Sequence, residues 1–185
     1  MPRKSKKAQE IHTHIAVVVH DYAIRSEAGL NINLVVDRPI FYDDEDLAYE
    51  FVTTLDVSGK CIYPPDREGD CYEITIKGGE RHAGIHSQTL KDFQKRDEHG
   101  VPLYRTYRGE RIPVFDCPPG IAILEKRRGE RIWVSWMWVK QELVRDMLTV
   151  LAHVKPVYLH IHEFKKDRQR WVRSISLQTT NPEDE

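Results

Sequence analysis

Ile132-Trp-Val-Ser-Trp-Met-Trp-Val139, followed at once by Lys140-Gln-Glu-Leu-Val-Arg-Asp-Met-Leu-Thr-Val-Leu-Ala-His153, is the stretch that most strongly defines the fold. As a strand, the first segment is apolar on both of its faces, which is typical of a buried central strand. The second places its apolar side chains along one stripe of a helix, which Pro156 ends. The stripe comprises Leu143, Val144, Met147, Leu148, Leu151 and Val154. We therefore expect this helix to pack through the stripe onto a sheet.

The segments before this unit alternate between apolar and polar residues and are predicted as strands. Residues 11–25 and 30–36 are expected to form a hairpin through a turn at residues 26–29. A further strand is predicted over residues 47–57, with a turn at Ser58-Gly59.

Residues 71–77 predict another strand that ends at Gly78-Gly79. Ser87 is a candidate cap of a short helix that continues through Phe93. Residues 157–164 and 171–177 are expected to close the fold as a final hairpin. The fold class predicted is α+β: a β-rich antiparallel sheet or half-barrel of about nine strands with two packed helices.

Length and composition indicate one folded domain. The chain has 185 residues, of which 40% are hydrophobic and 31% charged, which favours a packed core over disorder. We expect a flexible basic tail over residues 1–10, a single domain over residues 11–178 and an acidic frayed tail over residues 179–185. Since no apolar run approaches the roughly 20 residues that cross a bilayer, a membrane partner is not expected. The composition leaves the oligomeric state open.

The three cysteines favour a reducing compartment. Cys61, Cys71 and Cys117 are widely spaced and form no CxxC pair, so neither a disulfide framework nor a zinc site is indicated. The basic N-terminus is followed by no apolar segment of signal-peptide length. A cytoplasmic protein is therefore predicted.

Charge is unevenly distributed although the formal net charge is only −1. Residues 37–56 carry seven acidic residues and one arginine, whereas residues 104–131 carry seven basic residues and four acidic ones. The acidic region allows one hypothesis, a protein–protein adaptor or inhibitor that acts through it. The basic region allows another, in which the protein binds an anionic partner.

A short internal repeat lies within the basic region. Arg108-Gly-Glu-Arg-Ile112 recurs twenty residues later as Arg128-Gly-Glu-Arg-Ile132. A glycine between two strand-like runs is typical of a tight turn. If residues 103–139 form an antiparallel meander, both turns lie at the same end of the sheet. The predicted anion-binding patch then comprises Arg105, Arg108, Arg111, Lys126, Arg127, Arg128 and Arg131.

Tyrosine and arginine in this region suit an anionic partner. The planar guanidinium binds phosphate or carboxylate in a bidentate manner, and Tyr104 and Tyr107 offer flat surfaces for stacking. The alternative is that these arginines are solvated turn residues paired with Glu110 and Glu130.

Histidines form two similar motifs, His12-Thr-His14 and His160-Ile-His162. On strands, residues two apart share a face, so each motif presents two imidazoles together. If the two strands are neighbours, His12, His14, His160 and His162 converge and provide ligands that zinc accepts. No sequence pattern predicts that pairing. We therefore expect no metal and no cofactor.

Three hypotheses follow from the sequence. The leading one is a non-enzymatic cytoplasmic protein that binds nucleic acid or an acidic protein surface through its basic hairpin turns. The second is a small histidine-based hydrolase or phosphodiesterase that acts with or without a metal ion. The third is the adaptor or inhibitor that acts through the acidic region.

Overall fold

The computed structural model describes residues 10–30, 49–79, 89–118, 120–153, 155–166 and 169–181. These residues contain ten strands, one α-helix and two short 3-10 helices. The strands are β1 (Ile11–Leu30), β2 (Tyr49–Tyr63), β3 (Cys71–Gly79), β4 (Tyr104–Tyr107), β5 (Glu110–Pro113), β6 (Ala122–Ile123), β7 (Glu125–Lys126), β8 (Ile132–Val139), β9 (Tyr158–Lys166) and β10 (Gln169–Gln178). The helices are η1 (Pro65–Arg67), η2 (Leu90–Phe93) and α2 (Gln141–His153).

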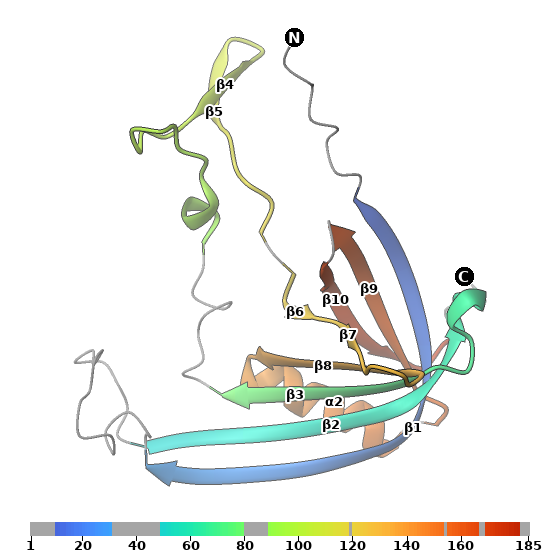
Figure 1. The fold of residues 1–185 in the computed structure, drawn as a ribbon. Coiled ribbons are helices and arrows are strands. Elements are labelled where there is room, and N and C mark those ends of the chain that lie inside the picture. Colours follow the sequence, from blue (N-terminus) through green and yellow to red (C-terminus); the bar gives the residue numbers. More distant parts are fainter. Residues whose placement is uncertain are drawn as a thin grey trace.

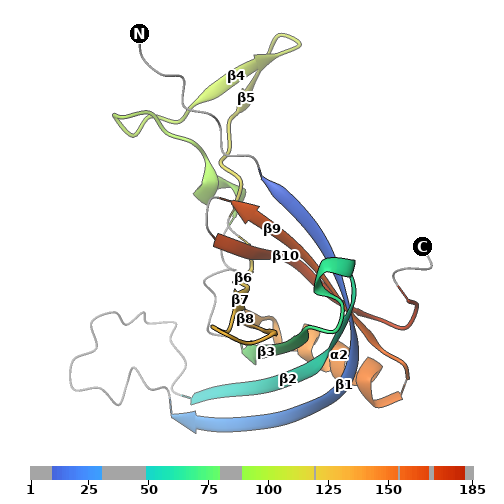
Figure 2. The ribbon, with the colours of Figure 1, turned by 45° about the vertical axis from the view of Figure 1, so that its right-hand side comes forward.

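Eight of the strands form one strongly curved sheet in the order β6-β10-β9-β1-β2-β3-β8-β7 (Figure 1). The sheet nearly closes into a barrel, because the Ser135 hydroxyl on β8 donates a hydrogen bond of 2.8 Å to the carbonyl oxygen of Ile123 on β6. β4 and β5 form a separate two-stranded ribbon (residues 104–113) that projects away from the barrel (Figures 1 and 2). The β-rich class is confirmed.

The prediction of a purely antiparallel sheet is wrong, because β3 and β8 pair in parallel. Parallel neighbours need a crossover of a dozen or more residues. The chain between Gly79 and Ile132 is much longer than that, and it contains the ribbon, β6 and β7. The meander predicted for residues 103–139 is also wrong, because among the described residues β5 pairs only with β4, in a separate sheet.

The prediction of two packed helices is also wrong. The segment predicted as the first helix forms only the 3-10 turn η2, which buries no residue. Its N-cap is Thr89, whose backbone N–H and hydroxyl both donate hydrogen bonds to the Asp92 carboxylate, whereas Ser87 lies outside the described residues. Since none of its residues is buried, η2 does not pack onto the sheet as a second helix.

Two predicted turns lie instead inside long strands. Residues 26–29 continue β1, where Ala28 pairs with Phe51, and Gly59 continues β2, where it pairs with Val19. A Cβ atom on Gly59 would lie 2.2 Å from the carbonyl oxygen of Val18. The glycine therefore permits a close backbone approach beside a register shift of β1 and does not form a turn. The strand predicted over residues 30–36 lies outside the described residues beyond Leu30.

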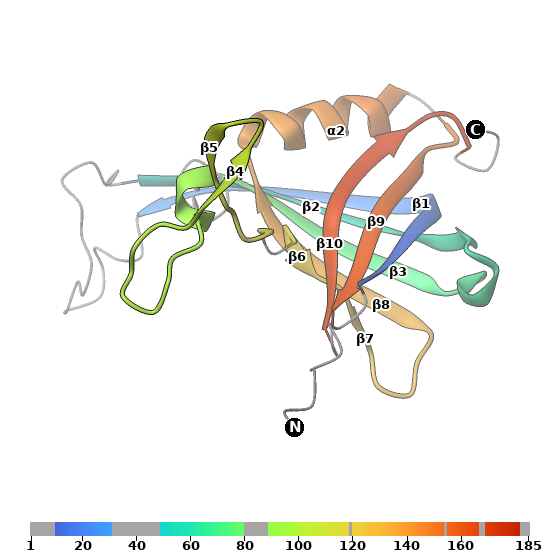
Figure 3. The same cartoon turned by 90° about the horizontal axis from the view of Figure 1, so that it is seen from above.

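Helix α2 packs against β2, β3 and β10 (Figure 3), as the apolar stripe predicts. Val144, Met147 and Leu151 are buried, and Leu148 is half-buried against the core. Leu143 is 40% exposed, so its assignment to the packing face was wrong. Helix α2 lies close to Gly78, near the end of β3. A Cβ atom on this glycine would lie 2.7 Å from a side-chain methyl carbon of Val144.

The tryptophans of β8 are divided between the two sides of the sheet. Trp133 is buried in the barrel, whereas Trp136 is 64% exposed on the outer side. The prediction that both faces of this strand are buried is therefore wrong, since only alternate residues of β8 are buried and Trp136 lies exposed on the outer face. Within the described ranges, no helix is both long enough and apolar enough to span a membrane.

Candidate functional site

The β4–β5 ribbon holds three of the seven arginine and lysine residues predicted to bind anions. Its turn is tight, with φ of 50° at Arg108 and 85° at Gly109, the paired positive values of a hairpin turn. Every side chain from Tyr104 to Arg111 is exposed. The ribbon is therefore open to a partner on both of its faces.

Arginine and tyrosine side chains stack on one another along this ribbon. The Arg111 guanidinium lies 4.3 Å from the ring centre of Tyr104, and that of Arg108 lies 5.3 Å from the ring centre of Tyr107. Among the described residues, no carboxylate lies within ion-pair distance of Arg105, Arg108 or Arg111. The positive charges of the ribbon are thus pre-positioned beside aromatic rings and are not neutralised by that part of the chain.

The β7–β8 hairpin carries the second copy of the repeat but has different surroundings. Arg131 donates a short hydrogen bond to the Asp70 carboxylate, and the ammonium of Lys126 lies 3.9 Å from that carboxylate. Arg127 donates to Glu73 at 2.6 Å. Three of the four cations of this hairpin are therefore paired with acidic residues of the barrel.

The seven predicted residues do not share one sheet. Arg105, Arg108 and Arg111 belong to the ribbon, and the other four belong to the β7–β8 hairpin of the barrel. Figures 1, 2 and 3 show the two turns well apart. The expectation that they gather at one end depended on the meander and falls with it.

A buried ion cluster lies inside the barrel at the end of β3 remote from α2. Arg67 donates two hydrogen bonds to the Glu163 carboxylate, at 2.7 and 2.9 Å, and Arg170 donates a third at 2.5 Å. Glu163 is completely buried and Arg67 is 6% exposed. The Arg67 guanidinium also lies 4.4 Å from the ring centre of Trp133.

The surroundings of the cluster shift the pKa values of Arg67 and Tyr72. Burial alone would lower the pKa of Arg67, but its hydrogen bonds with Glu163 and Tyr72 raise that pKa above its ordinary value. Burial also raises the pKa of the Tyr72 hydroxyl. Sequence reasoning missed the cluster, because 96 residues separate Arg67 from Glu163 and only the barrel joins them. With its charges satisfied internally, the cluster is a structural element of the barrel.

Asp70 links the barrel to the β7–β8 hairpin. Its carboxylate is buried and accepts hydrogen bonds from the Trp133 indole, at 2.9 Å, and from Arg131. Burial alone would raise the pKa of Asp70, but these hydrogen bonds lower it below its ordinary value. At pH values between the folded and the unfolded pKa, the carboxylate of Asp70 is therefore ionised in the folded protein and protonated in the unfolded chain.

Asp70→Asn is expected to lower the free energy of unfolding by about 1–3 kcal/mol at neutral pH, because Arg131 loses a charged acceptor. A group with a depressed pKa stabilises the fold above its unfolded pKa, near pH 4, and loses that contribution as pH falls toward its folded pKa. The difference between wild type and variant in urea denaturation should thus be constant from about pH 7 to pH 5 and shrink below about pH 4. An unchanged difference at acid pH would contradict the ionised state of Asp70.

The histidine motifs, in contrast to the basic turns, do converge. β1 and β9 are antiparallel neighbours with His14 opposite His162, so His12, His14, His160 and His162 form one imidazole ladder on the outer side of the sheet. Nδ1 of His12 lies 3.2 Å from Nε2 of His162, and Nδ1 of His14 lies 3.3 Å from Nε2 of His160. Burial, together with the neighbouring imidazoles, lowers the pKa of His162. The convergence of the four histidines, which the sequence allowed only if the two strands are neighbours, is therefore present.

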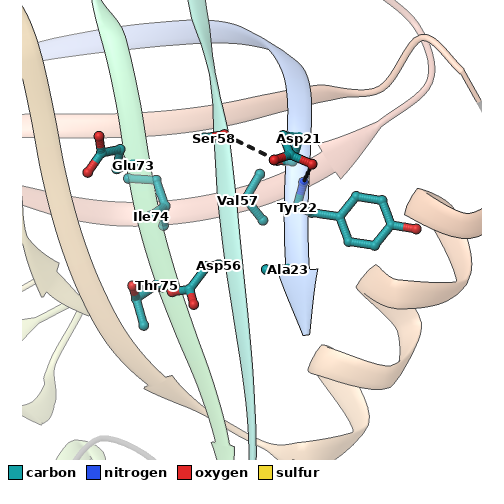
Figure 4. Close-up of a pocket in the computed structure, with 9 residues that line it drawn as sticks. All are labelled: Asp21, Tyr22, Ala23, Asp56, Val57, Ser58, Glu73, Ile74 and Thr75. Atoms are coloured by element: carbon teal, nitrogen blue, oxygen red, sulfur yellow. Dashed lines mark hydrogen bonds between the residues drawn. The ribbon is translucent and has the colours of Figure 1, made fainter. Parts of the chain in front are cut away.

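A shallow hollow of about 240 Å³ on the same outer side of the sheet lies across β1, β2 and β3 (Figure 4). The side chains of Asp21, Asp56 and Glu73 line it, while Tyr22 points away toward α2. Thr75 donates a hydrogen bond of 2.6 Å to Asp56. Carboxylates repel phosphate, so this hollow is unsuited to the anionic partner predicted from the sequence.

The remaining predicted features fall mostly outside the described residues. The acidic region has only residues 49–56 in the described part, and the tails there are reduced to Glu10 and residues 179–181. Cys61, Cys71 and Cys117 are all free thiols, and burial raises the pKa of Cys61 to about 11.

Comparisons with protein-family models, with curated proteins and with solved structures found no match for this chain. Function is therefore inferred from the ribbon, the barrel and the imidazole ladder themselves.

Proposed function

We propose that the protein is a non-enzymatic cytoplasmic binding protein that engages single-stranded nucleic acid through the β4–β5 ribbon. The observation that carries the proposal is the pair of exposed arginine–tyrosine stacks on a ribbon that projects from the barrel. The proposal retains the three residues of the predicted patch that lie on the ribbon, Arg105, Arg108 and Arg111. It leaves out the β7–β8 hairpin, because three of the four cations there are paired with carboxylates.

Chemistry favours nucleic acid over an acidic protein as the partner. Arginine forks bind phosphate oxygens, and base–aromatic stacking contributes about 1–3 kcal/mol per base in single-strand recognition. Tyr104 and Tyr107 are 44% and 54% exposed, so both rings have surface available for stacking. An acidic protein surface would use the arginines but would leave both rings without a function.

Architecture also favours a partner for the ribbon. An isolated two-stranded hairpin is at best marginally stable in water. Below the ribbon, backbone hydrogen bonds from Leu103 to Lys95 and from Lys95 to Val114, each 2.8 Å, extend the paired structure toward the barrel. The chain thus supports an exposed element that contributes little to its own core.

The two basic hairpins supply a test that is matched in charge. Arg105→Ala/Arg108→Ala removes two charges from the ribbon, and Arg127→Ala/Arg128→Ala removes two from the β7–β8 hairpin, with the same change of net charge. The ribbon variant should weaken binding of a short fluorescent single-stranded oligonucleotide. It should also flatten the log–log salt dependence by about 1.4 units, because each phosphate contact contributes about 0.7. Fluorescence anisotropy at several salt concentrations measures both.

The control variant is expected to bind as wild type does. Equal weakening by both variants would mean that affinity follows net charge and not the ribbon. Failure of the wild-type protein to bind the oligonucleotide at low salt would overturn nucleic acid as the partner.

A further inference from the structure

We propose that the imidazole ladder is a binding site for zinc, in which each diagonal pair of histidines supplies two ligands of one tetrahedral Zn²⁺. The pairs are His12 with His162 and His14 with His160. This proposal is independent of the ribbon and of nucleic acid.

The spacing of the nitrogen atoms carries the proposal. A tetrahedral zinc ion with Zn–N bonds of about 2.0–2.1 Å holds two nitrogen ligands about 3.3–3.4 Å apart. The facing nitrogens are 3.2 Å apart in the first pair and 3.3 Å apart in the second. The same distances suit an N–H···N hydrogen bond. Zinc would take the place of that hydrogen atom at an unchanged N···N distance, and the donor ring, still neutral, would carry its proton on its other nitrogen.

The strands make the two pairs equivalent. His14 lies opposite His162, His12 opposite Phe164 and His160 opposite Ala16, so each pair is a diagonal displaced by two residues from the other. Their inner members, His14 and His162, stack with ring centres 4.4 Å apart and an interplanar angle of 16°. Stacking fixes the direction in which both rings present their nitrogens.

The surroundings of His12 resemble the support that metal-binding histidines receive. A ligating imidazole usually turns its second nitrogen toward a carboxylate, which fixes its orientation. The Glu10 carboxylate lies 3.9 Å from Nε2 of His12, on the ring nitrogen that does not face His162, and the Lys166 ammonium lies 3.5 Å from Glu10. The ring of Phe164 stacks on that of His12, with the two ring centres 6.1 Å apart. Glu10 thus lies on the Nε2 side of the ring, and Nδ1 of His12 faces His162.

The ladder offers ligands in pairs only. Across the described ranges, no three His, Cys, Asp or Glu side chains are already grouped as a metal site. Each zinc ion would therefore keep about two of its four positions for water, one more than the single open position of a catalytic zinc site, and would differ from a closed structural site with four protein ligands.

Titration of the purified protein with ZnCl₂ by isothermal calorimetry tests the proposal. Wild type should bind two ions per chain. His12→Gln removes the first pair and His160→Gln removes the second, so each should bind one, and the double variant none. His99→Gln is the control, because His99 is exposed beside Glu98 and remote in sequence from the ladder. It should bind two. Mg²⁺, which prefers oxygen ligands, should not bind at these sites.

A second measurement keeps the test decisive if the double variant does not fold. In proton NMR spectra of the wild type, ring signals of His12, His14, His160 and His162 should shift with added Zn²⁺, and those of His99 and His153 should not. Zinc stoichiometry that is unchanged in both single variants, or ladder signals that do not respond to millimolar Zn²⁺, would overturn the site.

Discussion

Glu163→Gln is expected to lower the free energy of unfolding by about 3–5 kcal/mol, the cost of breaking a buried ion pair by removing one partner. The substitution conserves shape and removes only the charge. It leaves the guanidinium of Arg67, which is 6% exposed, without its countercharge. Urea denaturation at neutral pH, followed by tryptophan fluorescence and by circular dichroism, measures the change.

An exposed ion pair of the same kind provides the control. Glu73→Gln removes the carboxylate that pairs with Arg127 at 2.6 Å, but both side chains are more than 40% exposed. Its expected cost is below about 1 kcal/mol, because water and salt screen such pairs. Adding Arg67→Gln to Glu163→Gln should recover part of the loss, since the buried guanidinium of Arg67 is then gone and the remaining one, of Arg170, is 30% exposed to water. Equal midpoints for the two single variants would contradict the burial of Glu163.

Leu151→Ala is expected to lower the free energy of unfolding by about 2–5 kcal/mol, through lost burial and the cavity left in the core. Leu151 is 3% exposed in α2, whereas Leu143, on the same helix, is 40% exposed. Leu143→Ala makes the same chemical change and should cost less than about 1 kcal/mol, because surface truncations have small effects.

Denaturant midpoints of these two variants test which face of α2 packs on the sheet. Leu148 is only half-buried, so Leu148→Ala should fall between them. A reversed order of Leu143 and Leu151 would mean that the helix is rotated about its axis relative to the barrel.

Local patterns in the sequence predicted local structure well. The apolar stripe located α2, and strict alternation located β3, with Tyr72, Ile74 and Ile76 buried and the residues between them facing outward. These features depend on the periods of the helix and the strand, which are visible in a short window. Glycine was a weaker guide, because Gly59 allows close backbone contact and does not form a turn.

Partners distant in sequence were not predictable in the same way. Two-residue spacing correctly indicated that His12 shares a face with His14, but no local pattern states that β1 lies beside β9. The repeat shows the same limit. Arg111 stacks on Tyr104, whereas Arg131, at the same position of an identical pentapeptide, binds Asp70. The tertiary neighbours, and not the motif, decide which arginine stays available.

The pairing of β1 with β9 has a consequence for synthesis of the chain. His14 pairs with His162, which lies 148 positions further along the chain, so β1 has no neighbour on that side until nearly the whole domain has left the ribosome. Until then one edge of the β1–β2 hairpin exposes unpaired backbone groups, a state that favours association with other chains. Such long-range closure is also slow, because the entropy of a large loop opposes it. We therefore expect the nascent protein to depend on chaperones that shield strand edges, and its yield to fall when translation of the last third is delayed.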